Sequence, residues 1–401
     1  MQILGYCKEI CPCTDIKGIV MDKTNLRKEN KTRKSHHAVI VGAGPAGIGM
    51  GIALKDFGID DFVILEKGLI GSTFLKWTTE TRFLTPSFQS TQFGLLDLNA
   101  VAINTSPAYS SGKEHLSGPE YVHYLNRVVY EFQLPVHEER EVLTVVKRDG
   151  DFVLETADAY YVTEYLIWAT GEFQFPNDQP FPGAEHCIHS SRIASYRDLK
   201  GSGFTIIGGY ESGVDAALNL ALLGREATIL ERGTVVNSRD QDPSVTLSFY
   251  TKQRLDEATA ADNIRLEEQT EVNRVSRWGD GTFRVHTAEG YYASPTPPIL
   301  ATGFRGGETQ VRDLFYHTGG RPQLNERDES TKTAGLFLIG PHVMHQGVIF
   351  CFIYKFRQRF AIIANYIAGR IGLDTGEVVN LYRRHNMFLD DLSCCQEDCK
   401  C

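Results

Sequence analysis

Three glycines carry the clearest chemical signal in the sequence. Gly42, Gly44 and Gly47 follow an apolar run in the spacing G-x-G-x-x-G. Such a turn between a strand and a helix lets the backbone approach a pyrophosphate, and the helix N-terminus presents free N–H groups to the phosphates. Glu66 ends the next apolar run, 62–65, close to the roughly 20-residue spacing of a carboxylate that binds a ribose hydroxyl. The pattern predicts a dinucleotide site.

A second unit repeats this layout further along the chain, with an apolar run, a glycine turn, an alanine-rich stretch, another apolar run and an acid. Tyr210 stands where the second glycine is expected, and a bulky side chain there crowds a pyrophosphate. Two interpretations follow: a second nucleotide site, or a half that keeps the fold and binds nothing. On the first interpretation the binding residues are Gly208, Gly209, Ser212, Gly213, Glu231 and Arg232.

The cysteines form a third chemical group. Of the nine, seven lie near the two ends of the sequence, where the spacing C-x-x-x-C-x-C occurs twice. In a reducing cytosol this arrangement favours metal binding or redox chemistry over a disulfide framework, and thiolates suit Cu(I) or Zn²⁺. The alternative is that these ends bind metal only incidentally. The candidate metal ligands are Cys7, Cys11, Cys13, Cys394, Cys395, Cys399 and Cys401, of which Cys394 and Cys395 are also candidate catalytic residues.

Composition excludes several classes of protein. A chain of 401 residues is too long for a single hydrophobic core and predicts about two domains. The net charge of −9 argues against a nucleic-acid partner. The sequence has no run of about 18 apolar residues that would span a membrane and no secretory signal, so we expect a cytoplasmic protein.

These residues need elements to position them. The first unit predicts a strand, a helix and a strand over 38–65, and the second unit predicts the same over 204–230. Each half then closes with an apolar run and an Ala-Thr-Gly turn, at 169–171 and at 301–303. We expect little regular structure over 22–36.

The stretches between and after these units predict further elements. The segments 71–77 and 82–88 combine aromatic residues with glycine or proline, which indicates an ordered loop region beside the cofactor site. Ser117, followed three residues later by glutamate, predicts the start of a helix. Late in the chain, 335–341 predicts a buried strand, and 348–368 predicts a long apolar helix.

Taken together, residues 38–370 resemble the two-dinucleotide-binding-domain flavoproteins, and within them the flavin-containing monooxygenase and thioredoxin-reductase-like group. The resemblance implies an α/β fold of two Rossmann-like domains, the first binding FAD and the second binding NADH or NADPH. It divides the chain into a Cys-containing N-terminal tail and linker (1–37), the first part of the FAD domain (38–175), an inserted NAD(P) domain (176–304), the second part of the FAD domain (305–370) and a Cys-rich C-terminal tail (371–401). The residues that it assigns to FAD are Gly42, Gly44, Pro45, Ala46, Gly47, Glu66, Lys67, Trp77, Thr85, Thr170, Gly171 and Gly340.

Three departures from that group bear on the reaction. The body of the chain has no C-x-x-C, which excludes disulfide chemistry at the place usual for thioredoxin reductases. Pro341 and His342 stand where the late motif of the reductases has an aspartate, and 181–190 carries the oxygenase fingerprint with an altered gap. His342 and His345 are candidate catalytic residues that could tune the flavin or transfer a proton, and a structural, hydrogen-bonded role is the alternative.

The function that the resemblance implies is hydride transfer from NAD(P)H to FAD, followed by oxidation of a small-molecule substrate by flavin and oxygen, as in a monooxygenase. Two alternatives stay open: a reductase of disulfides or of a thiol-bound metal that uses the C-terminal cysteines, and a non-catalytic metal-binding protein on a flavoprotein scaffold. Glu231 favours the ribose of NADH, whereas Arg232 beside it could pair with the 2′-phosphate of NADPH, so the nicotinamide stays open. A homodimer is compatible with this organisation.

Overall fold

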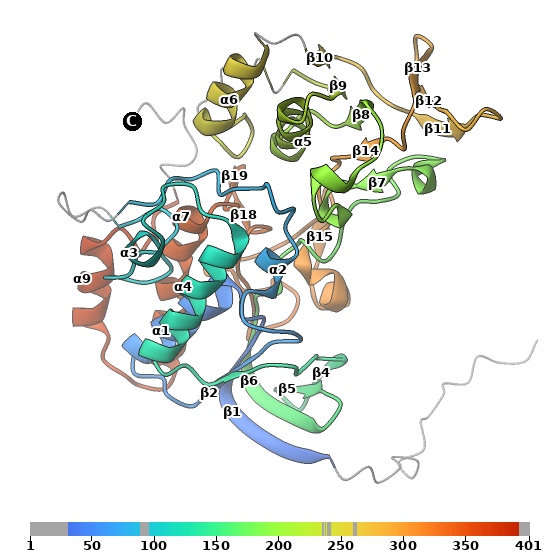
Figure 1. Ribbon diagram of the computed structural model, residues 1–401. Helices are drawn as coiled ribbons and strands as arrows, with labels where there is room; N and C mark the ends of the chain where they lie inside the picture. Colours follow the sequence, from blue (N-terminus) through green and yellow to red (C-terminus); the bar gives the residue numbers. More distant parts are fainter. Residues whose placement is uncertain are drawn as a thin grey trace, which may run out of the picture.

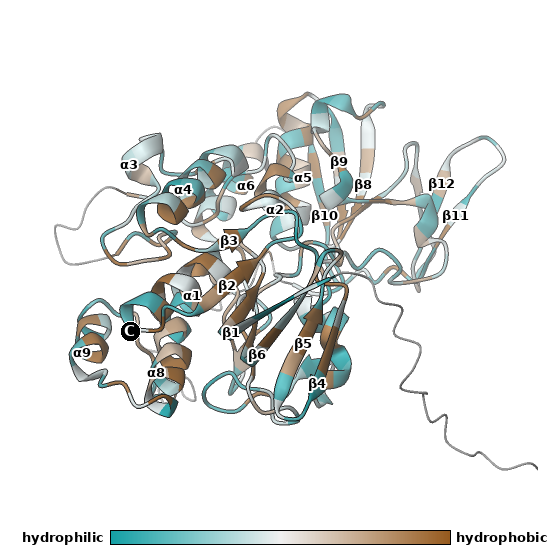
Figure 2. Cartoon of the chain, turned by 90° about the horizontal axis from the view of Figure 1, so that it is seen from below, coloured by the Kyte–Doolittle hydropathy of each residue, from teal (hydrophilic) through white to brown (hydrophobic). Residues whose placement is uncertain are grey.

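The computed structural model describes residues 31–88, 96–234, 236, 238, 242–259 and 263–392. Within them the chain forms two lobes, each built on a sheet whose central strands are parallel, with helices packed against it (Figure 1). The strands of the first lobe are largely hydrophobic, whereas much of the surrounding loop surface is hydrophilic (Figure 2). No helix in the described part of the chain is long and apolar enough to cross a membrane.

The first lobe is organised around a seven-stranded sheet in the order β3-β2-β1-β6-β5-β4, with β17 attached to β6. Its strands β1 and β2 are parallel because helix α1 (Pro45–Asp56) carries the chain back between them. Residues 38–41 are buried, as expected for a central parallel strand. The strands are β1 (Thr32–Val41), β2 (Phe62–Leu65), β3 (Val136–His137), β4 (Thr144–Arg148), β5 (Asp151–Glu155), β6 (Ala159–Trp168) and β17 (Leu336–Leu338).

Strand β6 has two partners along the side that faces away from β1. Its first half pairs antiparallel with β5, and its last three residues, 166–168, pair parallel with β17. The predicted late strand therefore returns to the first sheet. This return places Gly340 against the start of α1, where a Cβ added to it would lie 3.6 Å from the Cβ of Ala46.

The helices of the first lobe follow local sequence rules. Helix α4 (Gly118–Glu131) begins as predicted, with the Ser117 N–H donating to the Glu120 carboxylate at 2.8 Å. Helices α1 and α8 (Phe360–Arg370) pack so closely that a Cβ added to Gly49 would lie only 2.2 Å from the Phe360 ring. The remaining elements of this lobe are α2 (Ser72–Leu75), α3 (Ala108–Ser111), η4 (Gly307–Leu314), β15 (His317–Thr318), β16 (Arg321–Pro322), β18 (Met344–His345), β19 (Val348–Ile349), α7 (Ile353–Phe356), η5 (Arg357–Arg359) and α9 (Gly376–Arg384).

The prediction of one long helix over 348–368 is wrong in its first part. The β18–β19 hairpin turns through Gly347, whose φ is +91°, and the 3-10 turn η5 separates α7 from α8. Two arginines in this turn are buried and bound to fixed partners. Arg357 donates to the Ala100 carbonyl at 2.8 Å, and Arg359 Nε donates to the Asp328 carboxylate at 3.0 Å.

Part of the stretch predicted to have little regular structure is ordered, because residues 32–36 extend β1 and pair with 159–163 of β6. Within the segment assigned to the C-terminal tail, α9 and the residues after it as far as 392 bury apolar side chains on the first lobe. Tyr382 is 1% exposed, and its hydroxyl donates to the Asp56 carboxylate at 2.6 Å.

The second lobe repeats the plan of the first. Its parallel strands run in the order β10-β9-β8-β14-β7, and α5 connects β8 to β9 as α1 connects β1 to β2. A small antiparallel sheet, β11-β12-β13, projects from the outer side of this lobe (Figure 1). The elements are η1 (Ala184–His186), β7 (Ile188–His189), η2 (Ser190–Arg192), η3 (Tyr196–Asp198), β8 (Gly203–Ile207), α5 (Glu211–Leu222), β9 (Glu226–Leu230), α6 (Phe249–Thr259), β10 (Ile264–Glu267), β11 (Arg274–Arg277), β12 (Phe283–His286), β13 (Tyr291–Ser294) and β14 (Ile299–Leu300).

Two crossing segments, 173–177 and 303–305, join the lobes and pair with each other. The Asn177 N–H donates to the Gly303 carbonyl at 2.9 Å, and the Arg305 N–H donates to the Phe175 carbonyl at 2.8 Å. The predicted domain boundaries at 176 and 304 fall within these segments, and they remain a prediction.

A loop of the first lobe also docks on the second lobe. The Thr79 N–H donates to the Ala194 carbonyl at 2.9 Å, and the Thr81 hydroxyl donates to the Asp215 carboxylate at 3.0 Å. The predicted ordered loop after β2 therefore helps to set the position of one lobe against the other.

Candidate functional site

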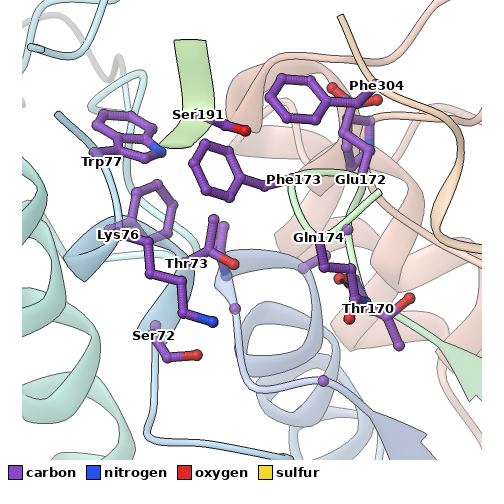
Figure 3. A pocket seen from close by; sticks show the side chains of 18 of the residues that line it. Ser72, Thr73, Lys76, Trp77, Thr170, Glu172, Phe173, Gln174, Ser191 and Phe304 are labelled. Carbon is purple, nitrogen blue, oxygen red and sulfur yellow. Dashed lines mark hydrogen bonds between the residues drawn. The ribbon is translucent and has the colours of Figure 1, made fainter. Parts of the chain in front are cut away.

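A cavity of about 830 Å³ lies between the two lobes. It begins at the glycine turn after β1 and reaches the N-terminus of α5 in the second lobe. Trp77 and Lys76 lie on one side of it, Glu172 and Phe304 on the other, and Phe173 projects between them (Figure 3). The residues predicted for FAD that line this cavity are Gly42, Gly44, Pro45, Ala46, Glu66, Lys67, Trp77, Thr85, Thr170 and Gly171.

Each of the three positions in the first turn is a glycine for its own reason. Gly42 has φ +108°, and a Cβ there would lie 2.5 Å from the Ala169 carbonyl oxygen. A Cβ on Gly47 would lie 1.9 Å from the Gly42 carbonyl oxygen, so both positions are fixed by the packing of the protein itself. Gly44 has φ −84°, which other residues adopt, and a Cβ there would meet nothing within 4 Å. Because Gly44 lines the cavity, a pyrophosphate bound there explains the glycine, and the turn fits FAD.

Glu66 is held at the end of β2 beside this turn. It is 8% exposed, and its two carboxylate oxygens accept hydrogen bonds from the Ala43 N–H at 2.8 Å and from the Gly68 N–H at 2.9 Å. Both bonds come from the backbone, so the carboxylate has a fixed direction at the cavity wall. This is the position that the sequence predicts for a ribose-binding acid.

The predicted loop supplies an aromatic wall. The Trp77 ring contacts Phe74 edge to face at 4.9 Å and lies 5.0 Å from Phe83 between ring centroids. Thr85 donates a hydrogen bond to Asn99. These contacts hold Trp77 and Thr85 at the cavity, where an aromatic ring system such as a flavin would be covered.

The glycines of the second unit repeat the packing of the first. A Cβ on Gly208 would lie 2.4 Å from the Ala301 carbonyl oxygen, and a Cβ on Gly213 would lie 1.9 Å from the Gly208 carbonyl oxygen. Tyr210 takes the place of the second glycine, and its hydroxyl donates to the Pro243 carbonyl at 2.6 Å. Of the residues predicted for the nicotinamide nucleotide, Ser212 lines the cavity.

The acid of the second unit is also in place. Glu231 is 3% exposed, and its side chain lies against Gly209, where a Cβ would approach it to 2.7 Å. Arg232 is exposed. Neither residue is among those that line the cavity, so the choice between NADH and NADPH stays open.

The first Ala-Thr-Gly turn is tied to the chain that re-enters the first lobe. The Thr170 hydroxyl donates to the Gly307 carbonyl at 3.1 Å, and Trp168 Nε1 donates to the same oxygen at 2.8 Å. Gly340, with φ +104°, lies against the start of α1, and its neighbour Pro341 lines the cavity.

The two candidate catalytic histidines belong to separate polar networks. His342 Nδ1 lies 2.8 Å from the buried Glu308 carboxylate. His345 is buried and hydrogen-bonded to Asp328, which also binds Arg359, so its contacts are those of a structural residue. Neither histidine is among the residues that line the cavity.

The described residues include two of the cysteines. Cys351 is half-buried, lines the cavity just before α7, and lies 3.3 Å from the Ser244 hydroxyl. Burial raises the pKa of the Cys187 thiol to about 12. The predicted metal ligands and redox candidates near the two ends, including Cys394 and Cys395, lie outside the described residues. Within the described part of the chain, no group of three or more histidine, cysteine or acidic side chains could hold a metal ion.

Glu172 is one of the acidic residues at the cavity that sequence reasoning missed. Glu172 directly follows the first Ala-Thr-Gly turn and lines the cavity. Burial raises the pKa of its carboxyl, and the repulsion from Glu308 acts in the same direction, while His342 and Arg321 oppose the shift. A carboxylate next to a turn already assigned to the cofactor was the available signal.

Comparisons with known proteins agree with this architecture. A family model described as pyridine nucleotide-disulphide oxidoreductase matches residues 39–340. The bacilliredoxin reductase Bdr of Bacillus subtilis is 27% identical over 312 residues, which cover 76% of this chain and 88% of that protein. The probable indole-3-pyruvate monooxygenase YUCCA10 of Arabidopsis thaliana is 26% identical over 209 residues, which cover 48% of this chain and 51% of that protein.

A solved structure supports the same fold. The bacillithiol disulfide reductase Bdr from Staphylococcus aureus superposes with a TM-score of 0.66 at 22% identity, over 84% of this chain and 99% of that one. The expectation of a two-domain flavoprotein fold is therefore confirmed, and the alternative of a non-catalytic scaffold is wrong. The chain belongs to the pyridine nucleotide-disulphide oxidoreductase family and is an FAD-dependent oxidoreductase.

Proposed function

We propose that the protein transfers two electrons from NAD(P)H through FAD to a small-molecule disulfide. The observation that carries this proposal is the single cavity that runs from the first glycine turn to the N-terminus of α5. Both nucleotide-binding units contribute to its wall, so a hydride donor and a flavin can bind in one cavity. FAD, when bound, supplies the redox chemistry, and the protein supplies binding, alignment and electrostatics.

The cavity residues divide this work. The turn at Gly44 and the N-terminus of α1 would bind the pyrophosphate of FAD, and Glu66 would bind its ribose. Trp77 and its aromatic neighbours would cover the ring system and keep water from it. Ser212, in the first turn of α5, would face the nicotinamide nucleotide.

The choice of a disulfide as electron acceptor reverses the order that the sequence alone favours. The alignment with the bacilliredoxin reductase spans 88% of that protein, whereas the alignment with the monooxygenase spans 51%. The proposed reaction is NAD(P)H + H⁺ + RSSR → NAD(P)⁺ + 2 RSH, which balances in atoms and charge. It requires no cysteine pair within the described residues, where Cys351 is the cysteine that lines the cavity.

The test is anaerobic turnover of the purified holoprotein with NADH or NADPH and a set of small disulfides, including cystine, glutathione disulfide and bacillithiol disulfide. We expect nicotinamide oxidation that depends on the disulfide and yields two thiols for each NAD(P)H. A variant with serine in place of the seven cysteines near the ends should keep this activity. Absence of disulfide-dependent turnover in the wild-type protein would contradict the proposal.

A monooxygenase is the second candidate, and the aromatic wall favours it. Trp77, Phe173 and Phe304 give the cavity an apolar section in which flavin and oxygen chemistry would be shielded from water. This candidate predicts that NAD(P)H oxidation requires oxygen and that an oxygenated product accumulates in step with it. Nicotinamide oxidation in the absence of oxygen, driven by a disulfide, would exclude it as the main activity.

A further inference from the structure

The proposed reaction consumes one proton for each NAD(P)H, because the nicotinamide delivers a hydride and the acceptor leaves with two hydrogens. The same balance holds when oxygen is the acceptor and becomes hydrogen peroxide. The proton is needed when electrons leave the flavin, not when they arrive on it. Where the bound nucleotides keep bulk water from the acceptor, the proton must come from an acidic group on the cavity wall that can be protonated again from outside.

Glu172 has the position for this role. It follows the Thr170–Gly171 turn at the FAD end of the cavity and lies on the cavity wall beside Phe304 (Figure 3). Among the described residues its carboxyl makes no hydrogen bond, in contrast to Glu66, whose two oxygens are both occupied. A carboxyl without a competing partner is free to exchange a proton with a bound molecule.

A polar pair lies behind Glu172. His342 Nδ1 is 2.8 Å from Glu308 Oε2, and His317 Nε2 is 4.0 Å from the other oxygen of Glu308. The Glu308 side chain is 2% exposed, whereas those of His342 and His317 are 17% and 14% exposed. Burial alone would raise the pKa of Glu308, but the hydrogen bond and charge of His342 outweigh it and lower this pKa. Glu308 is therefore the ionised hydrogen-bond partner of His342.

Two glycines bring this pair up to the cofactor turn. A Cβ on Gly306 would lie 2.0 Å from His342 Nδ1 and 2.1 Å from Glu308 Oε2. A Cβ on Gly307 would lie 2.2 Å from the Gly171 carbonyl oxygen. The His342–Glu308 pair therefore packs closely against Gly306, and the turn packs closely against the adjacent Gly307.

We propose that Glu172 donates the proton that the electron acceptor takes up, and that the His342–Glu308 pair reloads Glu172. This inference takes only the identity of the electron acceptor from the proposed function. The charged groups that interact electrostatically with Glu172 are His342, Arg321 and Glu308, all from the re-entering chain of the first lobe. Glu172 interacts in the same way with the Cys351 thiol. In this arrangement Glu172 is the group at the cavity, and His342 and Glu308 are positioning residues.

The experiment separates the two halves of turnover by stopped-flow absorbance. Holoprotein is reduced anaerobically with NAD(P)H and then mixed, across a pH series, with cystine or with oxygenated buffer. In Glu172→Gln we expect flavin reduction within about twofold of wild type and reoxidation about 100-fold slower, which is the range of general acid catalysis. Because burial raises the pKa of Glu172, the wild-type reoxidation rate should fall as pH rises through that raised value. In the Gln variant this limb of the profile should disappear.

A second readout does not depend on turnover. The infrared spectrum of protein without nicotinamide, recorded across a pH series, should contain the C=O band of a protonated carboxyl that is lost as pH rises, and the wild-type minus Glu172→Gln difference should isolate it. His342→Gln should slow reoxidation and change its pH profile while the infrared band stays. Glu141→Gln removes another carboxylate from the cavity wall, on the exposed side, and serves as the matched control.

The outcomes of the two proposals are distinguishable. If cystine fails to reoxidise the wild-type flavin, the disulfide reductase proposal fails, and the proton role of Glu172 is still decided by the oxygen arm. If reoxidation in Glu172→Gln equals that of wild type in both arms, or if no carboxyl band is lost, the proton role is overturned. A variant that also loses flavin reduction would show that Glu172 places the cofactor, which likewise overturns it.

Discussion

The backbone N–H of Ala43, inside the first glycine turn, donates a 2.8 Å hydrogen bond to the carboxylate of Glu66 at the end of the neighbouring strand. This bond joins the turn that we propose to bind the phosphates to the carboxylate that we propose to bind the ribose. A second bond from the Gly68 N–H, at 2.9 Å, holds the other oxygen. Each oxygen keeps a further lone pair with which a ribose hydroxyl can pair.

Replacement of Glu66 should weaken FAD binding more than it weakens the fold. In Glu66→Ala we expect an FAD dissociation constant roughly 10- to 100-fold higher, the loss that follows from removing hydrogen bonds to a charged group. Isothermal titration of apoprotein with FAD measures this, with circular dichroism as the check on folding. Unchanged affinity would mean that the ribose lies elsewhere.

Gly44 and Gly47 should respond in opposite ways to a side chain. In Gly44→Val the apoprotein should keep its melting temperature, because the added atoms face the cavity, but it should bind no FAD and be colourless. Gly47→Ala should lower the melting temperature, because its Cβ would lie 1.9 Å from the Gly42 carbonyl oxygen. Thermal unfolding of both apoproteins and flavin absorbance after reconstitution give the answer. A yellow Gly44→Val protein would remove the pyrophosphate from this turn.

His345 should prove structural. In His345→Phe the buried Asp328 carboxylate loses one of its partners, and we expect the free energy of unfolding to fall by about 1–3 kcal/mol. The rate of flavin reduction by NAD(P)H should stay within about twofold of wild type at a temperature where the variant is folded. Urea unfolding and stopped-flow reduction measure the two effects. A large kinetic loss with unchanged stability would make His345 a functional residue after all.

We expect the protein to stay folded when it is truncated after residue 392 but not when it is truncated after residue 370. A protein that ends at 370 loses Tyr382, Met387 and Leu392, which are buried in the first lobe. Burying an apolar side chain contributes about 1.5–3 kcal/mol, so this truncation should unfold the protein or leave it insoluble. A protein that ends at 392 keeps those contacts and should melt close to the full-length protein. Equal melting temperatures for the two truncations would contradict the packing of α9.

The two cysteines within the described residues should react slowly with alkylating reagents. Burial raises the pKa of the Cys187 thiol to about 12 and also raises that of Cys351, against the opposing hydrogen bond of Ser244 and charge of Lys355. Since the thiolate is the reactive form, iodoacetamide at pH 8 should modify both far more slowly in the native than in the unfolded protein. Mass spectrometry of the variant lacking the seven cysteines near the ends resolves the two sites. Rapid native labelling of Cys351 would indicate an activated thiol in the cavity.

Much of this architecture could be predicted because it depends on short-range rules. Glycine spacing, buried apolar runs and a capping pair at Ser117 and Glu120 are properties of neighbouring residues, and the structure follows them at β1, α1, α4 and α5. The carboxylate of Glu66 also falls where the spacing placed it. These features need no knowledge of distant contacts.

The errors come from contacts between distant parts of the chain. Residues 32–36 are polar, and they become strand because β6 offers a partner 127 residues further on. Arg357 and Arg359 are buried because distant carbonyls and Asp328 bind them, and no local pattern of residues reveals those partners. Glu172 was overlooked because its neighbours His342 and Arg321 lie far along the sequence.

The pairing of the crossing segments has a mechanical consequence. Two antiparallel strands of backbone that are hydrogen-bonded to each other, Asn177 to Gly303 and Arg305 to Phe175, resist bending separately. The second lobe can therefore rotate chiefly about the axis that both segments share. Such a turn would have to part Thr81 from Asp215 while leaving the two Ala-Thr-Gly turns at nearly the same separation. The pairing of the two segments thus restricts the directions in which one lobe can move against the other.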